Sequence, residues 1–415
     1  MAKTATQAQS KSEAIIERHD RFMTGNYPRY PIVIDSGKGS QLLDIDGNAY
    51  LDLFAGFGAG ILGHCHEDLV TAGTKQMNKL WHVGNLLHTE PQTRLAACLS
   101  ERGFGGRSFF CHSGSDANEA AFKLARLHGA ATGGRHKIIA TEGSFHGRGF
   151  AAMQATGQGK VREGFEPHLP GFVHVPYNDL AAMAAAIDAQ TVGIIVEPIQ
   201  GEGGVIVPDD KYLPGLRKLA DEHDLVLIFD EVWTGCGRTG RYFAYQHWGA
   251  APDVMTLGKA IGAGLGVGVA CVSDRVAEYF DAGHMGRVTH ATTLGGNAVA
   301  MAVSARLFEV LERDELVERA TELGQRISQR LRTFAADHPY VKQVRGKGLF
   351  LGIELDPGHD GAWFEKGADV VNRCMERGVM INVTQTNVLR LAPPLVITDE
   401  QIDQGLAVLE DVLNG

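Results

Sequence analysis

The chain has few cysteines, and they form no recognisable pattern. Its 415 residues include six, at positions 65, 98, 111, 236, 271 and 374, with no C-x-x-C pair and no spacing typical of a disulfide framework. We therefore expect free thiols and a reducing, cytoplasmic compartment. The first 22 residues also lack the apolar core of a signal peptide, and their acidic side chains are unlike those of a mitochondrial transit peptide.

Long apolar runs and clusters of positive charge are missing from the sequence as well. No stretch approaches the roughly 20 apolar residues that span a bilayer. The formal net charge is -10, and no stripe of lysine and arginine overrides it, so we expect neither nucleic acid nor an anionic membrane as a partner. His64 and His66 flank Cys65, but no second cluster at ligand spacing accompanies them, so we predict no metal site. Small molecules are the expected ligands.

Three successive apolar runs end in ionisable residues. Val192–Val196 runs into Glu197, Leu225–Phe229 runs into Asp230, and Lys259 follows the next run within the glycine-flanked segment TLGKAIGAG. Open α/β sheets bind their ligands outside the carboxyl ends of the strands. A lysine amine together with an aspartate suits an aldehyde cofactor that has a ring nitrogen, which describes pyridoxal phosphate. Strand ends also collect charges simply because they meet water, and the order of these residues favours the cofactor.

A strand, turn and helix upstream supply a candidate phosphate site. The pattern predicts an amphipathic helix over 116–128 that begins with a capping box of Asp116 and Glu119. In the preceding turn, Gly114 permits close backbone approach. The free N–H groups and the positive dipole end of a helix start make Gly114 and Ser115 candidates for holding a phosphate. An ordinary capped helix is the alternative.

The order of the expected helices and strands predicts an α/β fold with a second, smaller domain. Helices and strands alternate from about residue 67 to 275, which is typical of a mostly parallel central sheet flanked by helices. We predict a large domain over 67–295. A smaller α+β domain is expected from two separate segments, 1–66 and 296–415, of which the second contains long amphipathic helices followed by strands.

One glycine motif favours a different class of enzyme. Gly235–Gly240 matches the dinucleotide fingerprint G-x-G-x-x-G and follows a strand, which would suit a nicotinamide-dependent oxidoreductase. The match is weak because five residues, Asp230–Thr234, separate the strand from the first glycine, and Arg241 opens a poor helix.

Eight segments in order resemble the class III, fold-type I aminotransferases over nearly the whole chain. They are LWHVGNLLHTEPQ, FFCHSGSDANEAAFKLAR, SFHGR, VEPIQGEGG, FDEVWTGCGRTG, the Lys259 segment, TTLGGN and NVTQTNVLRLAPPL. The resemblance implies a pyridoxal-phosphate enzyme, in particular one that moves the ω-amino group of N-acetylornithine to 2-oxoglutarate in arginine biosynthesis. Ornithine, succinylornithine and 4-aminobutyrate are alternative amino donors, and a non-catalytic pyridoxal-phosphate-binding regulator is a remote alternative.

The resemblance assigns roles around the cofactor ring. The lysine matching Lys259 forms the Schiff base and carries the proton between substrate and cofactor, and Asp230 pairs with the pyridine nitrogen. Val232 would pack under one face of the ring and Phe145 would stack on the other. Such a sandwich holds the reacting C–H bond perpendicular to the ring plane; plain core packing is the alternative for Phe145.

The resemblance also implies a homodimer with shared active sites. Gly114 and Ser115 would bind the phosphate, and Thr293 of the partner subunit would complete its binding. Most relatives have a glutamine where Trp233 stands, and it donates a hydrogen bond to the phenolic oxygen of the cofactor. Trp233 can donate only through its indole N–H. Residues 58–60, Gly-Ala-Gly, also replace larger residues that shape the distal pocket in relatives.

Two arginines are the expected substrate contacts. Arg390 lies within the apolar run Val388–Leu391, where an unpaired charge is costly, so it must be paired or face a cavity. Its planar fork suits an α-carboxylate. The resemblance adds Arg148 as the contact for a second carboxylate or for acetylornithine, and Thr292 as its polar neighbour. Glu202 matches a gate that pairs with the arginine when a substrate lacks a second carboxylate.

Overall fold

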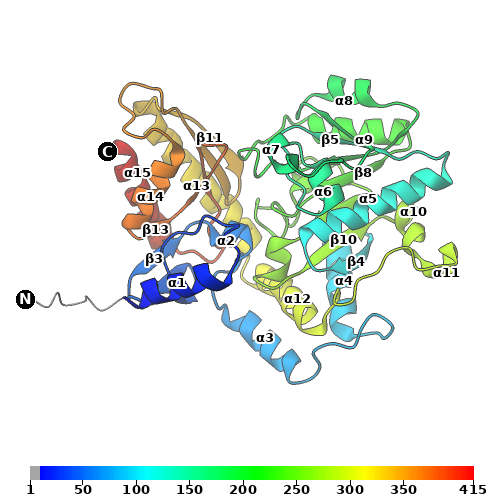
Figure 1. Cartoon of the computed structure of the whole chain (residues 1–415), viewed down its shortest axis with the longest axis horizontal. Coiled ribbons are helices and arrows are strands. Elements are labelled where there is room, and N and C mark those ends of the chain that lie inside the picture. The colour runs from blue at the N-terminus through cyan, green and yellow to red at the C-terminus, as the bar shows by residue number, and fades with distance from the viewer. Residues whose placement is uncertain (1–9) are drawn as a thin grey trace, which may run out of the picture.

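Residues 10–415 are described by the computed structural model, and they form two lobes (Figure 1). The large lobe is built around a seven-stranded sheet, and the small lobe around two four-stranded sheets. In Figure 1 the blue N-terminal elements lie beside the orange and red C-terminal ones in the small lobe. No helix in the described part of the chain is long and apolar enough to cross a membrane.

The sheet of the large lobe is mostly parallel. Its strand order is β4-β10-β9-β8-β7-β5-β6, and only β10 runs antiparallel to its neighbours. The strands are β4 (Arg107–Cys111), β5 (Lys137–Thr141), β6 (Phe172–Val175), β7 (Thr191–Val196), β8 (Val226–Asp230), β9 (Val254–Leu257) and β10 (Gly268–Val272). The alternation of helices and strands in the sequence predicted a mostly parallel sheet. It did not indicate that β10 runs in the opposite direction to the other strands.

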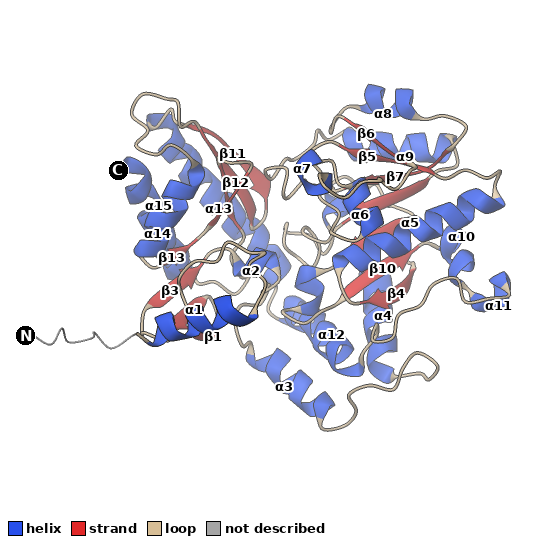
Figure 2. Ribbon diagram, viewed as in Figure 1, coloured by secondary structure: helices blue, strands red, loops and turns tan. Residues whose placement is uncertain are grey.

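Both faces of this sheet are covered, which is why its central strands are continuous apolar runs. Along β8, Leu227 and Phe229 join one hydrophobic cluster, whereas Val226 and Ile228 join the other. Helices surround the strands in Figure 2. The helices of this part of the chain are α3 (Glu67–Met77), α4 (Glu90–Arg102), α5 (Gly114–Ala131), α6 (Phe150–Ala155), α7 (Gly159–Arg162), α8 (Leu180–Ala186), α9 (Tyr212–Glu222), α10 (Asp274–Ala277) and α11 (Ala282–Met285).

The small lobe joins the two ends of the chain. One sheet contains β1 (Ile34–Lys38), β2 (Gln41–Asp44), β3 (Ala49–Asp52) and β13 (Val379–Met380), and the parallel pairing of β3 with β13 links the N- and C-terminal segments. The other sheet contains β11 (Val341–Lys347), β12 (Phe350–Leu355), β15 (Val388–Leu391) and β14 (Asn382–Thr384). The remaining helices are α1 (Lys11–Phe22), α2 (Ala55–Gly58), α12 (Ala298–Arg313), α13 (Leu316–Asp337), α14 (Gly367–Glu376) and α15 (Asp399–Asn414).

The predicted fold class is confirmed: a mostly parallel sheet flanked by helices, with a smaller α+β unit. The limits of the two domains stay a prediction. Helix α12 begins beyond residue 295 but packs against α3 and α4, which precede that limit.

The start of α5 differs from the prediction. Ser113 is the N-cap, and its hydroxyl oxygen accepts a hydrogen bond from the N–H of Asp116 at 3.2 Å. The Glu119 carboxylate does not close a capping box; it accepts from the N–H groups of Ala151 and Ala152 at 2.9 and 3.0 Å. The extended backbone of Ser113 lets the serine cap the helix three residues before Asp116, so the helix starts at residue 114, two residues before the predicted start.

Asp253 fixes the register of the two strands that lead into the candidate site. It lies immediately before β9 and is 6% exposed. One carboxylate oxygen accepts from the N–H of Leu227 in β8 and from Arg217, both at 2.9 Å, and the other accepts from Arg275 at 2.9 Å. Burial raises the pKa of Asp253, but the hydrogen bond and charge of Arg275 outweigh burial, so the pKa is lowered overall.

We expect Asp253→Ala to destabilise the fold by about 3 kcal/mol, because it leaves one strand N–H without its acceptor and removes the buried carboxylate that pairs with the half-buried Arg217 and with Arg275. The midpoint of urea unfolding measures the effect, with Asp35→Ala, an exposed aspartate, as control. A carboxyl whose pKa is lowered by folding stabilises the fold above its ordinary value and stops doing so as pH falls through the folded pKa. The difference between wild type and variant should therefore shrink below about pH 4; a constant difference would contradict this role.

Candidate functional site

A cavity of about 380 Å³ opens at the carboxyl edge of the large sheet. The parallel strands β5, β8 and β9 end there, and β4 leads into α5 at the same edge. Because β10 runs in the opposite direction, the turn before it returns to this edge and closes one side. The residues that line the cavity are His112, Ser113, Gly114, Ser115, Asn118, Phe145, His146, Gly147, Arg148, Asp230, Val232, Lys259, Leu265, Gly266 and Val267.

Seven of the twelve residues predicted from the sequence lie around this one cavity. They are Gly114, Ser115, Phe145, Arg148, Asp230, Val232 and Lys259. The other five are Trp233, Thr292, Thr293, Arg390 and Glu202, which do not line it.

Asp230 is held rigidly at the floor of the cavity. Its Oδ2 accepts from the Asn118 amide at 2.8 Å and lies 2.7 Å from Nδ1 of His146, and its Oδ1 accepts from the N–H of Val232 at 3.0 Å. Asn118 is itself fixed, because its amide oxygen accepts from the Thr256 hydroxyl at 2.7 Å. This geometry presents a carboxylate in one orientation.

Sequence reasoning missed Asn118 and His146 as partners of Asp230. His146 directly follows Phe145 within the SFHGR segment, and Asn118 lies in the first turns of α5. Both side chains are fully buried although they are polar. A polar residue among apolar helix positions was the one available signal for Asn118.

Lys259 follows β9 with its backbone in the left-handed region, at a φ of 47°. The preceding Gly258 packs against the start of α5, where a Cβ atom would lie 2.8 Å from the backbone nitrogen of Gly114. Burial lowers the pKa of the Lys259 amine, and the carboxylates of Asp230, Glu202 and Glu197 oppose that shift. A lysine with a lowered pKa offers a neutral amine, which is the nucleophilic form.

The start of α5 provides a place for an anion. The N–H groups of Gly114 and Ser115 have no acceptor among the described residues. A Cβ atom at position 114 would lie 2.6 Å from the Val232 side chain, so only glycine lets the backbone at the start of α5 lie this close to Val232. The Ser115 hydroxyl oxygen accepts from the N–H of Gly149 at 3.0 Å and keeps its own proton to donate. A helix start with free N–H groups favours a phosphate.

Together these groups fit pyridoxal phosphate. The amine of Lys259 suits its aldehyde, the Asp230 carboxylate suits its ring nitrogen, and the start of α5 suits its phosphate. Phe145 and Val232 line the same cavity, and both are half-buried.

Glu197, the third acid at the strand ends, serves the backbone instead. Its two carboxylate oxygens accept from the N–H groups of Phe145 and Gly201 at 3.0 and 2.9 Å. Burial raises the pKa of Glu197, which the sequence could not indicate. These two bonds hold the segment that carries Phe145 next to the segment that leads to Glu202.

Arg390 is paired as its position in an apolar strand demands. It is 1% exposed, and it donates to Glu202 at 2.7 Å and to the Asn382 amide oxygen at 3.0 and 2.6 Å. The Glu202 carbonyl accepts from Thr384 and from Gln385, at 2.9 and 2.8 Å. The pair therefore joins the large lobe to the last strands of the small lobe.

Arg148, Thr292 and Thr293 are at least partly exposed, whereas Trp233 is 5% exposed. Arg148 is exposed, with its guanidinium carbon 5.5 Å from the centre of the Phe145 ring. The Thr292 hydroxyl lies 3.1 Å from the ring nitrogens of His112, which lines the cavity. Thr293 is exposed on the segment between α11 and α12.

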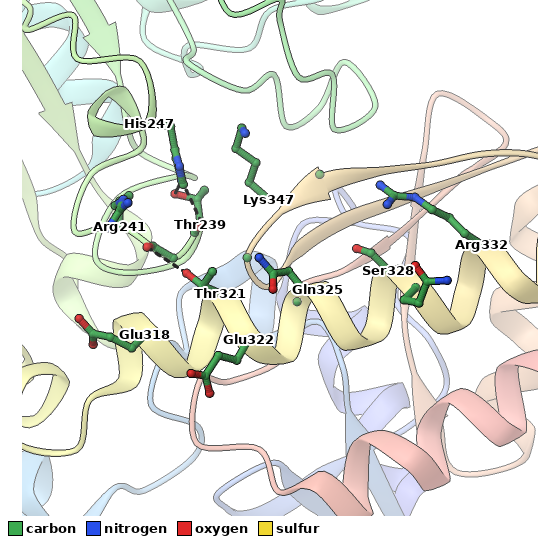
Figure 3. Close-up of a pocket in the computed structure, with 15 residues that line it drawn as sticks. Thr239, Arg241, His247, Glu318, Thr321, Glu322, Gln325, Ser328, Arg332 and Lys347 are labelled. Carbon is green, nitrogen blue, oxygen red and sulfur yellow. Dashed lines mark hydrogen bonds between the residues drawn. The ribbon is translucent and has the colours of Figure 1, made fainter.

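A second cavity, of about 690 Å³, lies elsewhere and contains none of the predicted site residues (Figure 3). Thr321 of α13 donates there to the carbonyl of Gly240 at 3.2 Å. The Gly235–Gly240 motif thus packs on a helix of the small lobe. It lies in consecutive turns, and the next helical piece is the 3₁₀ turn Ala244–His247, so it lacks the strand-to-helix geometry of a dinucleotide site.

The cysteines and the histidine pair form no centre of their own. All six cysteines are free thiols. Among residues 10–415, no group of three histidine, cysteine or acidic side chains is arranged to hold a metal ion. His64 instead pairs with Asp52, at 2.9 Å between Nε2 and Oδ2.

Comparison with known proteins gives one consistent family. The model of the family described as "Aminotransferase class-III" matches residues 22–413. The chain is 42% identical to the acetylornithine aminotransferase of Caldanaerobacter subterraneus over 96% of this chain and 99% of that one. It is 43% identical to the acetylornithine aminotransferase of Methanothermobacter thermautotrophicus over 97% of this chain and 99% of that one.

Solved structures have the same fold. The ornithine aminotransferase of Toxoplasma gondii superimposes with a TM-score of 0.91 at 31% identity, covering 98% of this chain and 96% of that one. The acetylornithine aminotransferase of Elizabethkingia anophelis gives a TM-score of 0.84 at 29% identity, covering 98% and 99%. A further structure of the T. gondii enzyme is described as having partial occupancy of PLP at its active site.

We expect Asn118→Ala to weaken binding of pyridoxal phosphate by about tenfold or more, because a hydrogen bond to a charged group contributes about 1.5–3 kcal/mol. Without the amide, Asp230 loses a donor that orients it. Titration of the cofactor-free protein, followed by cofactor absorbance, measures the dissociation constant. Asn78→Ala, at the exposed residue that follows α3, is the control. Equal affinity in wild type and Asn118→Ala would show that Asp230 does not depend on this contact.

Proposed function

Because the chain belongs to the class III aminotransferase family, we propose that it transfers the ω-amino group of N-acetylornithine to 2-oxoglutarate. It is a pyridoxal-phosphate-dependent aminotransferase, which takes an amino donor and a keto acid. The products would be N-acetylglutamate 5-semialdehyde and glutamate, with the reverse direction serving arginine biosynthesis. The observation that carries the choice of donor is identity of about 40% with several acetylornithine aminotransferases over nearly their full length.

The proposed roles at the cavity follow from charge and position. When bound, pyridoxal phosphate supplies an aldehyde carbon for the amino group and a ring that accommodates the electron pair of the broken C–H bond. The Asp230 carboxylate keeps a positive charge favourable at the ring nitrogen. Lys259 Nζ would bind the aldehyde, and once the amino donor has replaced it there, its free amine would accept the proton from the substrate carbon and deliver it to the former aldehyde carbon. Phe145 and Val232 hold the ring plane, and Gly114 and Ser115 hold the phosphate.

Two substrates of different shape share one pocket in this proposal. With Glu202 only 2.7 Å from Arg390, the guanidinium is closed to a second carboxylate. 2-Oxoglutarate and glutamate bring a carboxylate that replaces Glu202 on Arg390. N-acetylornithine leaves the Arg390–Glu202 pair intact, and its own carboxylate is received by Arg148, with Thr292 as a polar neighbour. Arg148 is suited to this role because it is exposed at the mouth of the cavity.

A homodimer and a cytoplasmic location belong to the same proposal. Thr293 is exposed and therefore available to a second subunit, where it would complete the phosphate site. The six free thiols support a reducing compartment. Ornithine is the second candidate donor, because ornithine aminotransferases are among the solved structures that superimpose on the chain, one with a TM-score of 0.91.

The donor is tested by mixing the cofactor-loaded protein with N-acetylornithine, ornithine, succinylornithine or 4-aminobutyrate. The rate at which each amine changes the absorbance of the bound cofactor measures the first half-reaction. We expect N-acetylornithine to react about tenfold faster than the others, since a pocket shaped for one chain discriminates by roughly that factor or more. A faster reaction with ornithine would overturn the named donor and leave the aminotransferase assignment intact.

Lys259→Ala is the matched control for this measurement. It should show no half-reaction with any amine, because no amine remains to bind the aldehyde or move the proton. Reduction of the wild-type protein with borohydride should fix the cofactor on the peptide that contains residue 259. An adduct on another lysine would contradict the proposed site.

Arg390→Leu separates the two half-reactions. We expect kcat/KM for 2-oxoglutarate and glutamate to fall about 100-fold, since removing one partner of a buried charge pair costs at least about 2–5 kcal/mol. The half-reaction with N-acetylornithine should change by less than about tenfold, because its carboxylate is received elsewhere. Stopped-flow measurement of each half-reaction tests the split. Arg377→Leu, at an exposed ion pair with Asp411, is the control; equal losses for both substrates would refute the role given to Arg390.

A further inference from the structure

Trp233 is a large side chain buried beside the candidate site. It is 5% exposed. Its indole stacks on the ring of Phe350, with 4.8 Å between centres and 18° between planes, and lies 6.0 Å from the ring of Phe54. These three aromatic rings belong to a third hydrophobic cluster, which also contains Ile199, Val205 and Ala392 and is separate from the two clusters on the faces of the large sheet.

Two glycines border opposite edges of this indole. A Cβ atom at Gly58 would lie 2.6 Å from Cζ3 on the six-membered ring, and a Cβ atom at Gly201 would lie 2.8 Å from Cδ1 on the five-membered ring. Both distances are shorter than side chains tolerate. The two glycines come from different lobes, one from α2 and one from the loop after β7. We call the space between them the indole slot.

Both cations of the proposed chemistry lie over the face of the same ring. The Nζ of Lys259 is 4.6 Å from the centre of the Trp233 ring, and the guanidinium carbon of Arg390 is 5.4 Å from it. Arg390 is also 5.4 Å from the ring of Phe54. A cation within about 6 Å of an indole face is attracted by its electron density. A glutamine has no such face and more rotatable bonds.

We propose that Trp233 is a positioning residue that fixes the amine of Lys259 relative to the guanidinium of Arg390, and that Gly58 and Gly201 form the slot that admits it. The proposal rests on the proposed roles of Lys259 and Arg390 and does not depend on which amine is the donor. The indole is rigid and wedged at both edges, so it sets one distance between the two cations. A substrate that reacts at Lys259 while its carboxylate is on Arg390 requires that distance to be constant.

The slot is tested on the cofactor-free protein with a cycle of Gly201→Ala, Trp233→Gln and the double variant. Gly201 is the better probe, because Gly58 has a φ of 77° and any side chain there is strained whatever its neighbours. We expect Gly201→Ala to lower the melting temperature by about 2 °C or more with Trp233 present, and by less than about 1 °C in the Trp233→Gln background. Gly159→Ala, where a Cβ meets nothing within 4 Å, is the control. Equal shifts in both backgrounds would overturn the slot.

Positioning of the amine is tested by capture of pyridoxal phosphate, which requires the neutral form of Lys259. An indole face favours the protonated form, so Trp233→Gln should lower the pH midpoint of capture by about half a unit to one unit. Trp233→Phe retains an aromatic face, so its pH midpoint should be lowered by no more than half as much as that of Trp233→Gln. The charges of Asp230, Glu197, Glu202 and Arg390 also act on Lys259 and are unchanged in these variants. An unchanged midpoint in Trp233→Gln would refute the contact.

The half-reactions separate positioning from a purely structural role. Trp233→Gln should raise KM for 2-oxoglutarate by about fivefold or more, while KM for the amino donor changes less, because only the keto acid uses both cations. Equal changes for both substrates would overturn the proposal. Lys259→Ala separates the proposed function from the role of Trp233. Covalent capture of the cofactor by Lys259→Ala would overturn the role of Lys259 and, with it, that of Trp233. Loss of capture in Lys259→Ala together with an unchanged midpoint in Trp233→Gln would overturn the role of Trp233 alone.

Discussion

Burial penalises every charge at the carboxyl edge of the sheet, so each ionisable group there must be paired or change its pKa. Asp230 and Arg390 are almost fully buried and are satisfied by side-chain partners, and Glu197 is satisfied by two backbone N–H groups. Burial still raises the pKa of Glu197, and it lowers the pKa of Lys259, where the nearby carboxylates only oppose the shift. A fixed carboxylate next to an amine that gives up its proton readily is the pairing that an aldehyde cofactor with a ring nitrogen requires.

The position of that pair is set at the other end of the strands. Asp253 accepts from the N–H of Leu227 and so fixes β9 against β8, and the two strands then place Asp230 and the segment of Lys259 at the same edge. The antiparallel strand β10 adds a third constraint, since the turn before it brings residues 265–267 back to the cavity. A shift of register in this hairpin would move the wall of the cavity as well as the strand.

The sequence was sufficient for the features that depend on apolar runs and on the residues directly after them. The central strands, the fold class and the ionisable residues at the strand ends could all be predicted, because both faces of the sheet are buried. The direction of β10 could not, because a short apolar run carries no information about direction. Asn118 and His146 were missed because they support Asp230 across long separations in sequence. Ser113 was missed because Asp116 and Glu119 offered a competing cap in the same turn.

The role of Trp233 concerns packing as much as chemistry. An indole occupies far more space than a glutamine side chain, and it fits only because positions 58 and 201, which border it, are glycine. A glycine costs about 0.5–1 kcal/mol of conformational entropy relative to alanine, whereas a tryptophan buries about 150–250 Å² of surface. A buried indole at position 233 is therefore compatible only with glycine at position 58. Residues 58 and 233 are 175 positions apart in sequence, yet they form a single contact beside the reactive amine.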